Sequence, residues 1–461
     1  MAYQFQKLYT LIAQTPMIHF QYDQAGATLR ATEVKPKLDK YLLKCAEKES
    51  VDQQTLNAWF IQGDSENKKD DKGTSSRKSF NYKMKIAKAG RPNDAEISLD
   101  DCKFYFGNQG NGEKKDLVFS NCKLEIVCFI PPLLEFIDRH IGDFFALHNF
   151  GTRQTKGFGG FLVRYHDHEG GVRAQSPEEI EKAFQESKQP YFYVDVPNGD
   201  KNLIKNRMNH ALTIYSIMKN GLNMTRYNED KGKYTFPDRY IKGFVMRPYL
   251  DQLDEKGELG SDKAFIKSKI LHSKDRDEMD ALDCDHKHYT FIRALLGLAE
   301  QYEFRDRYRN NGNTTNSRTG RTSYRPARVS IIHCPTNEDG SPKINPAMSQ
   351  NDVKKLSEIQ RFPSPVTIKI FQDRIYFLFN DSYKQILDRT FLFLSFDESI
   401  ADCLSKKHYL STPKTFEITA FIESFVLYYN TEAKAKLNSF RDSYTNNPYA
   451  NSKNLTLKKG W

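Results

Sequence analysis

A glycine-rich basic segment, GTRQTKGFGGF at 151–161, holds the residues of this chain that are best suited to binding chemistry. Glycine permits positive φ and carries no Cβ, so a phosphate can approach such a backbone closely and successive N–H groups can enclose it. The arginine and the lysine add full charges, and the phenylalanine could stack on a base if it is exposed. The binding candidates in this segment are Arg153, Lys156, Gly157, Phe158, Gly159 and Gly160.

The spacing of this segment does not fit two common nucleotide-binding motifs. It does not end in the GK[ST] of a Walker A loop, and it is not a GxGxxG turn after a strand. Nucleotide-cofactor binding is therefore unsupported, and we expect no cofactor. The alternative to phosphate binding is a tight helix-to-strand connection whose glycines serve only packing.

A second basic segment, 305–328, carries seven arginines and a single acidic residue, Asp306. Arginine side chains can bind phosphates and stack on bases, and such a segment could become ordered on RNA. The alternative is an ordinary solvated insertion. The arginines that we take as RNA-binding candidates are Arg305, Arg307, Arg309, Arg318, Arg321 and Arg325.

Hydrophobic periodicity predicts the elements that position the glycine-rich segment. Apolar residues recur at helical spacing in 131–148 and in 33–48, which predicts a helix in each range. FLVRYH at 161–166 predicts a strand, so a helix, a glycine-rich loop and a strand meet at 131–166. Residues 62–79 are polar and predict a flexible insert.

The second half of the chain repeats the strand–helix–strand pattern, which predicts two α+β units, each an antiparallel sheet with helices on one face. The further elements that we expect are strands at 191–196 and 240–250, helices at 201–221, 288–302 and 413–430, and a hairpin at 365–379. The expected organisation is a first domain at 1–170, a linker at 171–189, a second domain at 190–430 and a polar tail at 431–461.

Composition and charge narrow the class of partner. The chain has 461 residues and a formal net charge of +10, which is typical of nucleic-acid-binding proteins and equally compatible with a mildly basic enzyme. Its seven cysteines form no even framework, which indicates a reducing, cytoplasmic environment. We see no signal peptide and no uninterrupted apolar stretch long enough for a membrane span, so we expect no membrane partner.

Three stretches resemble a known family. NFGTRQTKGFGGF resembles the glycine-rich loop of the RAMP superfamily of CRISPR-associated RNA-binding proteins, in the form found in Cmr-type (type III-B) effector subunits. TPMIHF, followed by LRATEVKPKLDKYL, resembles the opening of the first Cmr RAMP subunit. FIRALLGLAE at 291–300 with RFPSPVTIKI at 361–370 is similar to a second RAMP unit. The tryptophan pair and the glycine expected in the opening helix are missing from 33–43, which indicates a divergent member.

The resemblance implies an α+β fold of tandem ferredoxin-like (RRM-like) domains with antiparallel sheets, a glycine-rich loop and long insertions. It implies assembly with other Cmr-type effector subunits in antiviral defence, where the chain would hold CRISPR guide RNA or target RNA near the 3′ end of the guide. Target cleavage in such complexes belongs to the repeated backbone subunit, so we expect no catalytic residue here. In a ferredoxin-like domain the cations Arg30, Lys35 and Lys37 would lie beside the glycine loop, the alternative being a solvated helix surface.

Histidines suggest a competing hypothesis. Guide-processing endoribonucleases of the same superfamily work without a metal and use a histidine to deprotonate a ribose 2′-OH, a role that fits its pKa. His19 and His148 are the candidates, and His140 is a third histidine in this domain. A third hypothesis is a protein-interaction module with an incidental basic surface.

Two segments contain side chains that could bind zinc, but the sequence does not predict a zinc site. Residues 284–288, CDHKH, and the pair His333-Cys334 offer zinc-ligand side chains. No paired CxxC or HxxxH accompanies them, so we expect no metal.

Overall fold

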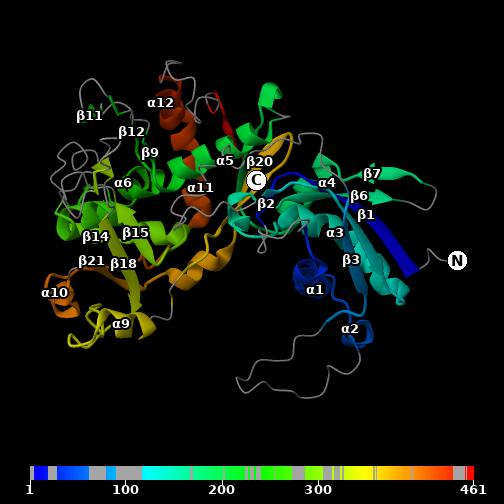
Figure 1. The fold of residues 1–461 in the computed structure, drawn as a ribbon, viewed down its shortest axis with the longest axis horizontal. Helices are drawn as coiled ribbons and strands as arrows, with labels where there is room; N and C mark the ends of the chain where they lie inside the picture. Colours follow the sequence, from blue (N-terminus) through cyan, green and yellow to red (C-terminus); the bar gives the residue numbers. More distant parts are fainter. Residues whose placement is uncertain are drawn as a thin grey trace. The chain divides into compact units, whose positions relative to one another are not determined.

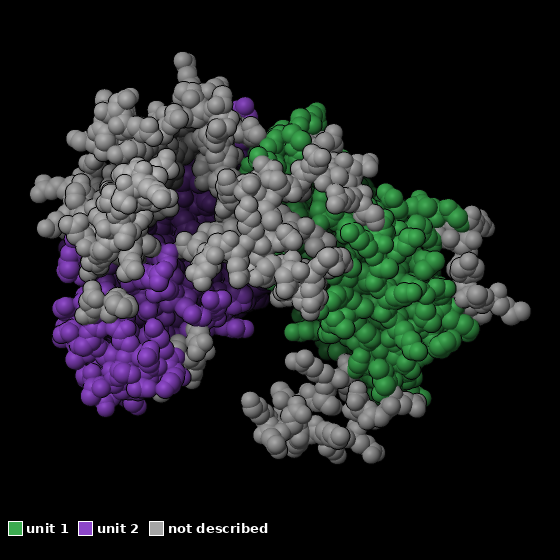
Figure 2. All heavy atoms as spheres, in the orientation of Figure 1, with its two compact units in different colours: residues 1–211, 367–378, 460–461 green, residues 212–366, 379–459 purple. Residues whose placement is uncertain are grey.

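The chain divides into two compact units (Figure 2). Unit one comprises residues 1–211, 367–378 and 460–461, and unit two comprises residues 212–366 and 379–459. The computed structural model describes residues 5–18, 28–61, 79–89, 117–166, 170–200, 203–223, 227–228, 233–234, 240–254, 256–272, 286–304, 314–315, 322–323, 327–356, 359, 361–395, 398–439, 452 and 454–461 (Figure 1).

The first part of unit one is a five-stranded antiparallel sheet with the strand order β3-β5-β1-β6-β7. Its elements in chain order are β1 (Gln6–Ala13), β2 (Met17–Ile18), α1 (Ala31–Lys48), α2 (Gln53–Trp59), β3 (Lys83–Lys88), β4 (Leu117–Val118), β5 (Cys122–Val127), α3 (Pro131–Leu147), η4 (Gln154–Lys156), β6 (Phe161–His166), β7 (Val172–Ala174) and α4 (Pro177–Glu186). The succession β1-α1-β3-β5-α3-β6 in this sheet order is a ferredoxin-like βαββαβ fold. The expected fold class is therefore confirmed for this half of the chain.

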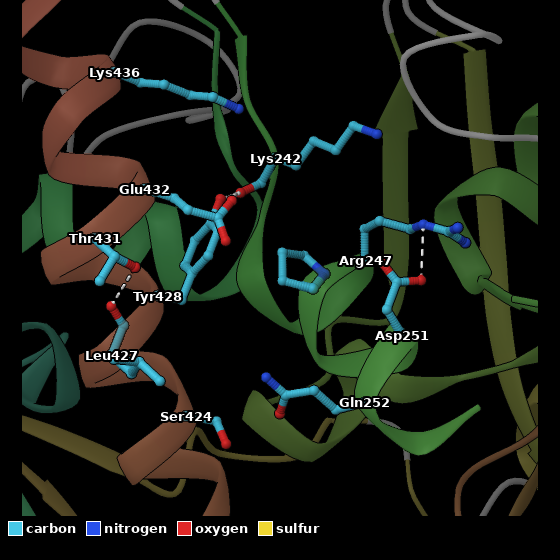
Figure 3. Close-up of a pocket in the computed structure, with 11 residues that line it drawn as sticks. Lys242, Arg247, Asp251, Gln252, Ser424, Leu427, Tyr428, Thr431, Glu432 and Lys436 are labelled. Carbon is cyan, nitrogen blue, oxygen red and sulfur yellow. Dashed lines mark hydrogen bonds and ion pairs between the residues drawn. The ribbon is translucent and has the colours of Figure 1, made fainter. Parts of the chain in front are cut away.

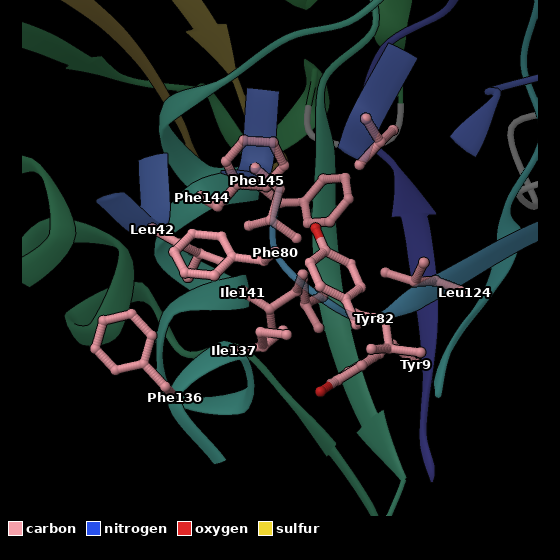
Figure 4. Close-up of a cluster of buried hydrophobic side chains, with 14 of the residues drawn as sticks. Tyr9, Leu42, Phe80, Tyr82, Leu124, Phe136, Ile137, Ile141, Phe144 and Phe145 are labelled. Carbon is pink, nitrogen blue, oxygen red and sulfur yellow. The ribbon is translucent and has the colours of Figure 1, made fainter. Parts of the chain in front are cut away.

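Helices α1 and α3 contact each other and cover one face of this sheet. Their apolar stripes and the inward residues of the strands form one core, drawn in Figure 4. Leu42 of α1, Ile141 and Phe144 of α3 and Leu124 of β5 are fully buried. Burying each such side chain contributes about 1.5–3 kcal/mol, so this core fixes the end of α3, from which the glycine-rich segment leaves.

A second βαββαβ succession follows in the chain. Its elements are β8 (Tyr191–Asp195), α5 (Ile204–Lys219), β19 (Val366–Ile370), β20 (Arg374–Phe379), α11 (Ile418–Tyr428) and β23 (Leu457–Lys459). The strands have the order β19-β20-β8-β23, the same topological order as in the first sheet. β8 and β20 are antiparallel, with Phe192 opposite Phe377 and their rings stacked at 4.6 Å. The two successions are the tandem ferredoxin-like arrangement that the sequence predicts.

Long insertions on both sides of the β19–β20 hairpin build a further antiparallel sheet in unit two, in the order β15-β18-β21-β22. The described elements of these insertions are β9 (Leu222–Asn223), β10 (Tyr227–Asn228), β11 (Lys233–Tyr234), β12 (Tyr240–Ile241), η6 (Phe244–Met246), α6 (Pro248–Leu253), β13 (Leu259–Ser261), α7 (Asp262–Phe265), η7 (Ile266–Ile270), β14 (His288–Thr290), η8 (Ile292–Leu296), β15 (Gln301–Phe304), β16 (Thr314–Thr315), β17 (Thr322–Ser323), β18 (Ala327–Cys334), α9 (Gln350–Leu356), η9 (Asp381–Ile386), β21 (Thr390–Ser395), α10 (Ile400–Ser405) and β22 (Tyr409–Ser411). After α11 follow η10 (Tyr429–Ala433) and α12 (Lys434–Ser439).

The structure corrects two expected elements. The helix expected at 288–302 is β14, the short 3-10 helix η8 and β15, because Gly297 at φ 106 ends the helical turn and all five residues of η8 are buried. The strand expected at 240–250 continues only through Ile241, and Pro248 then begins α6. Continuous apolar runs do not distinguish these alternatives by periodicity.

The range expected as a linker, 171–189, contains β7 and α4. A capping box starts this helix, because Ser176 Oγ accepts from Glu179 N and the Glu179 carboxylate accepts from Ser176 N. η5 (Asn198–Asp200) follows β8. No helix within the described ranges has both the length and the apolar character needed to cross a membrane.

Candidate nucleic-acid interface

The glycine-rich segment follows α3 directly and returns the chain to β6, as the sequence predicts. Three of its glycines have positive φ, Gly151 (79), Gly157 (86) and Gly159 (71), and so does Arg153. A Cβ on Gly151 would lie 2.6 Å from the Ile18 carbonyl oxygen, and one on Gly159 would overlap the carbonyl of Phe150. The packing role of these glycines is thus real, and it holds the segment in one conformation.

The backbone of this segment is not an open anion cradle. The N–H groups of Thr152 and Gly159 donate to the carbonyls of Ile18 and Pro16, each at 2.9 Å. The N–H of Gly160 donates to Thr15 Oγ1 at 2.8 Å. Since these donors are satisfied inside the protein, a bound phosphate would meet side chains of the segment and not this part of its backbone.

The carboxylate of Glu33 accepts one of the N–H groups that the sequence suggested for binding a phosphate. The N–H of Gly151 donates to Glu33 Oε1 at 2.8 Å, and the ammonium group of Lys37 lies 3.2 Å from the same oxygen. Lys37 Nζ also donates to Gln154 Oε1 at 3.1 Å. Lys37 therefore lies beside the glycine-rich segment, as expected, and it joins α1 to that segment.

Asn149 anchors the segment to the second sheet. Its Nδ2 donates to the carbonyls of Gln154 and Ile368, at 2.7 and 2.9 Å. The neighbouring Lys369 is completely buried, and its ammonium donates to Phe145 O and to the carbonyl of residue 148, at 3.0 and 2.8 Å. Burial lowers the pKa of Lys369 well below its usual value, but the amine donates to these carbonyls in either form, so β19 supports both the end of α3 and the segment.

Arg153 is the N-cap residue of the short helix η4, and Lys156 is its last residue. Arg153 has φ 57, a left-handed conformation that costs an L-residue about 1–2 kcal/mol. Burial, and to a smaller extent the charge of Arg153, lower the pKa of Lys156 to about 7. The two cations thus lie close enough to repel each other, and an added anion would relieve that repulsion.

Phe158 and Lys35 have different surroundings from those expected, whereas the role of Arg30 stays a prediction. Phe158 is completely buried, so stacking on a base is not available to it in this conformation. Lys35 makes its contacts elsewhere, with Asp39 at 2.8 Å and Ser79 Oγ at 2.9 Å. Arg30 is the exposed N-cap residue of α1.

The histidine candidates differ in what the structure describes. His19 lies outside the described residues. His148 ends α3, and its Nδ1 lies 2.9 Å from the carbonyl oxygen of Phe144. Burial lowers the pKa of His148 to about 4, so the ring is neutral and a weak base at pH 7.

Most of the arginine-rich segment at 305–328 lies outside the described residues. The six arginine candidates from Arg305 to Arg325 lie outside the described residues. Arg328, at the start of β18, is described, and its Nε lies 3.0 Å from Glu303 Oε1 on β15. The proposed role of this segment remains a prediction from its sequence.

The uncovered face of the first sheet carries cations that sequence reasoning missed. Lys83 and Lys85 of β3, Lys123 of β5 and Arg164 of β6 are all exposed. The register places Thr10 opposite both Lys123 and Arg164, so these side chains share the face turned away from α1 and α3. Alternation of apolar and basic residues along the strand KMKIAK at 83–88 is the signal that could have identified this face.

A groove in unit two mixes cations and acids (Figure 3). Tyr428, Glu432 and Lys436 line it from the α11–α12 side, and α6 lines the opposite side (Figure 3). The guanidinium of Arg247 lies 3.0 Å from Asp251 Oδ1 within this groove. The groove therefore presents side chains of both charges and not a uniformly basic surface.

Two successive βαββαβ folds, the first with a glycine-rich loop between its second helix and last strand, define a RAMP-type protein. The sequence matches the Cmr1 N-terminal domain over residues 5–222 and the Cmr1 C-terminal domain over residues 240–446. The chain belongs to the Cmr1 family and is a subunit of a multi-subunit type III-B CRISPR effector complex. No curated protein matches the chain.

Proposed function

We propose that this chain is a non-catalytic subunit that holds RNA in the effector complex, contacting guide or target RNA near the 3′ end of the guide. The proposed interface in unit one comprises the η4 cations and the uncovered basic sheet face. The observation that carries the proposal is Arg153, a long cationic side chain kept in a left-handed conformation by a rigidly packed loop. Strained backbone of this kind persists where the surrounding structure enforces it, often at binding sites.

The mechanism we propose is electrostatic holding. Arg153 can give two parallel N–H donors to one phosphate, and the lysines of β3 and β5 provide point charges along an extended strand of RNA. Such contacts read the RNA backbone and not its sequence, which suits a subunit that must accept any guide. The arginine-rich segment at 305–328 would add further phosphate contacts.

The surroundings of His148 support the non-catalytic proposal over the endoribonuclease. A general base works best with a pKa near the operating pH, and burial lowers that of His148 to about 4. Incubating the purified chain with repeat RNA in EDTA separates the two functions. Specific cleavage that is lost in His148→Ala would favour the enzyme.

The test of the proposal is the affinity of the purified chain for fluorescent single-stranded RNA at moderate salt. Arg153→Gln should weaken binding about tenfold, equivalent to about 1.4 kcal/mol. The control is Lys182→Gln on α4, an exposed cation with the same change of charge. Equal affinity of Arg153→Gln and the wild type would refute this role of the loop.

A further inference from the structure

A compact group of three side chains lies in the inserted sheet of unit two, outside every site discussed above. Glu398, Cys403 and His408 each present one ligand atom, and these atoms lie within 4.8 Å of one another. They precede, lie on and follow α10, which packs on β21. Cys403 is completely buried and His408 nearly so. Neither the glycine-rich loop nor the basic sheet face uses these residues.

The end of α10 brings two of these side chains together. Lys407 has φ 55, and the N–H of His408 donates to the carbonyl of Cys403 at 2.8 Å. This six-residue closure is the Schellman arrangement, which reverses the chain over the last helical turn. The N–H of Phe393 on β21 donates to the carbonyl of His408, so the returning segment is fixed to the sheet.

The distances fit a tetrahedral zinc ion. Zinc bonds of about 2.3 Å to sulfur and 2.0–2.2 Å to nitrogen and oxygen put tetrahedral ligand atoms about 3.3–3.4 Å (N to O) and about 3.6 Å (S to O) apart. His408 Nδ1 lies 3.3 Å from Glu398 Oε2, and Cys403 Sγ lies 3.6 Å from the same oxygen. These two spacings match zinc ligation, and Cys403 Sγ and His408 Nδ1, which lie within 4.8 Å of each other, would close to about 3.6 Å around the ion.

Hydrogen bonds alone account poorly for this arrangement. Glu398 Oε2 would have to accept from three groups, since Ser395 Oγ is also 3.0 Å away. A carboxylate oxygen has about two lone-pair sites, so one of the three donors would be poorly placed. The other oxygen, Glu398 Oε1, accepts a hydrogen bond from Lys406 Nζ at 3.0 Å. This contact fixes the carboxylate so that Oε2 faces the cysteine and the histidine, as hydrogen bonds to metal ligands commonly do.

We propose that Glu398 Oε2, Cys403 Sγ and His408 Nδ1 bind a zinc ion that ties α10 to the inserted sheet. Thiolate, imidazole and carboxylate together suit zinc better than magnesium or calcium. The Cys403 thiol loses its proton to solvent when the Zn–S bond forms, and the ion becomes its counter-charge. Three protein ligands leave a fourth position for water or for the hydroxyl of Ser395.

A metal at this place would stabilise a weakly built part of the molecule. The core between α9, α10 and the sheet is small and contains Cys403 itself, with Ile332, Cys334, Val353, Leu392, Leu394 and Ile400. α10 has only six residues, and helices of that length depend on tertiary contacts. An ion bound to the native state alone raises its melting temperature.

The experiment is titration of the full-length, metal-free chain with Co²⁺, followed by Zn²⁺ competition. We expect one equivalent of Co²⁺ to give a near-ultraviolet thiolate charge-transfer band and visible bands of a four-coordinate ion, both removed by Zn²⁺. Zn²⁺ should also raise the melting temperature. Absence of the thiolate band together with an unchanged melting temperature overturns the proposal.

Variants locate the site within the chain. Cys403→Ser and His408→Gln should abolish the cobalt band, whereas Cys334→Ser, a buried cysteine of the same small core, should retain it. Should Cys403→Ser fail to fold, alkylation of the wild type followed by peptide mapping replaces it. Zn²⁺ must then slow modification of Cys403 and leave unchanged that of Cys128, a buried cysteine in the separate core of unit one. Equal protection of both cysteines, or of neither, refutes the assignment.

Discussion

Substitution by glycine separates the RNA-binding role that we propose for Arg153 from the conformational cost of its left-handed backbone. Glycine adopts φ 57 without strain, so Arg153→Gly should raise the free energy of unfolding by up to about 1 kcal/mol. The same variant loses the guanidinium and should bind single-stranded RNA about tenfold more weakly, a difference of about 1.4 kcal/mol. Urea denaturation and fluorescence anisotropy measure the two effects. A variant that is less stable, or that binds RNA as the wild type does, would contradict this account.

Lys156 should make stability and RNA binding respond to pH in opposite directions. Its pKa is about 7 in the folded chain, below the value of about 10.4 usual for an unfolded lysine. Between these values the unfolded state binds more protons, so the stability of the wild type rises with pH relative to Lys156→Met. RNA binding needs the charged form, so the affinity of the wild type should fall above pH 7.

Urea denaturation and RNA affinity at pH 6 and pH 9, for the wild type and Lys156→Met, test this prediction. The stability difference between the two proteins should shrink as the pH rises, and only the wild type should lose affinity through this residue. If both proteins show the same pH dependence, Lys156 is neither buried as a cation nor a phosphate ligand.

At the scale of elements, the helix–loop–strand succession at 131–166 was predictable because its signals are local. The apolar stripe of α3 and the glycines after it can be recognised in the sequence without knowing which distant residues they contact. The helix expected at 288–302 failed because Ile292–Leu296 is apolar on every side, and only Gly297 indicates a break. The buried state of Phe158 could not be read from the segment alone.

Two glycines with positive φ, Gly159 in the loop and Gly170 outside it, differ in what an added methyl group would meet, which allows a matched comparison. A Cβ at Gly159 would overlap the carbonyl of Phe150, so Gly159→Ala should destabilise unit one by more than about 2 kcal/mol. Gly170 also has positive φ, at 83, but nothing lies within 4 Å of its Cβ position. Gly170→Ala should therefore cost only the backbone strain, about 1–2 kcal/mol. Equal losses for both variants, measured by urea denaturation, would contradict the tight packing of the loop.

At the scale of the whole molecule, the sequence predicts two ferredoxin-like folds but not what the insertions build. The sheet of unit two pairs β18 with β21, whose residues lie about sixty positions apart in the chain. Local sequence patterns cannot predict the register of two strands so far apart. The zinc candidates were missed for the same reason. Their spacing, Glu398-x4-Cys403-x4-His408, is no known zinc pattern and acquires meaning only through the turn at Lys407.

Binding by many phosphate contacts predicts a strong dependence on salt. The logarithm of RNA affinity should fall linearly with the logarithm of salt concentration, by about 0.7 per phosphate contact on a single strand. Lys83→Gln with Lys85→Gln should reduce this slope by about 1.4, because two contacts are lost. Lys384→Gln, an exposed cation paired with Asp381, is the control and should leave the slope unchanged. A slope that is the same in all three proteins removes the sheet face from the proposed interface.

The central claim is that the loop face of unit one touches RNA in the assembled effector complex. Photocrosslinking with 4-thiouridine placed along the guide or the target, followed by peptide mapping, tests it most directly. We predict crosslinks to peptides containing residues 151–161 or the β3 strand, reduced in Arg153→Gln and retained in Lys182→Gln. Complexes that hold their RNA and crosslink this chain only through other segments would contradict the account.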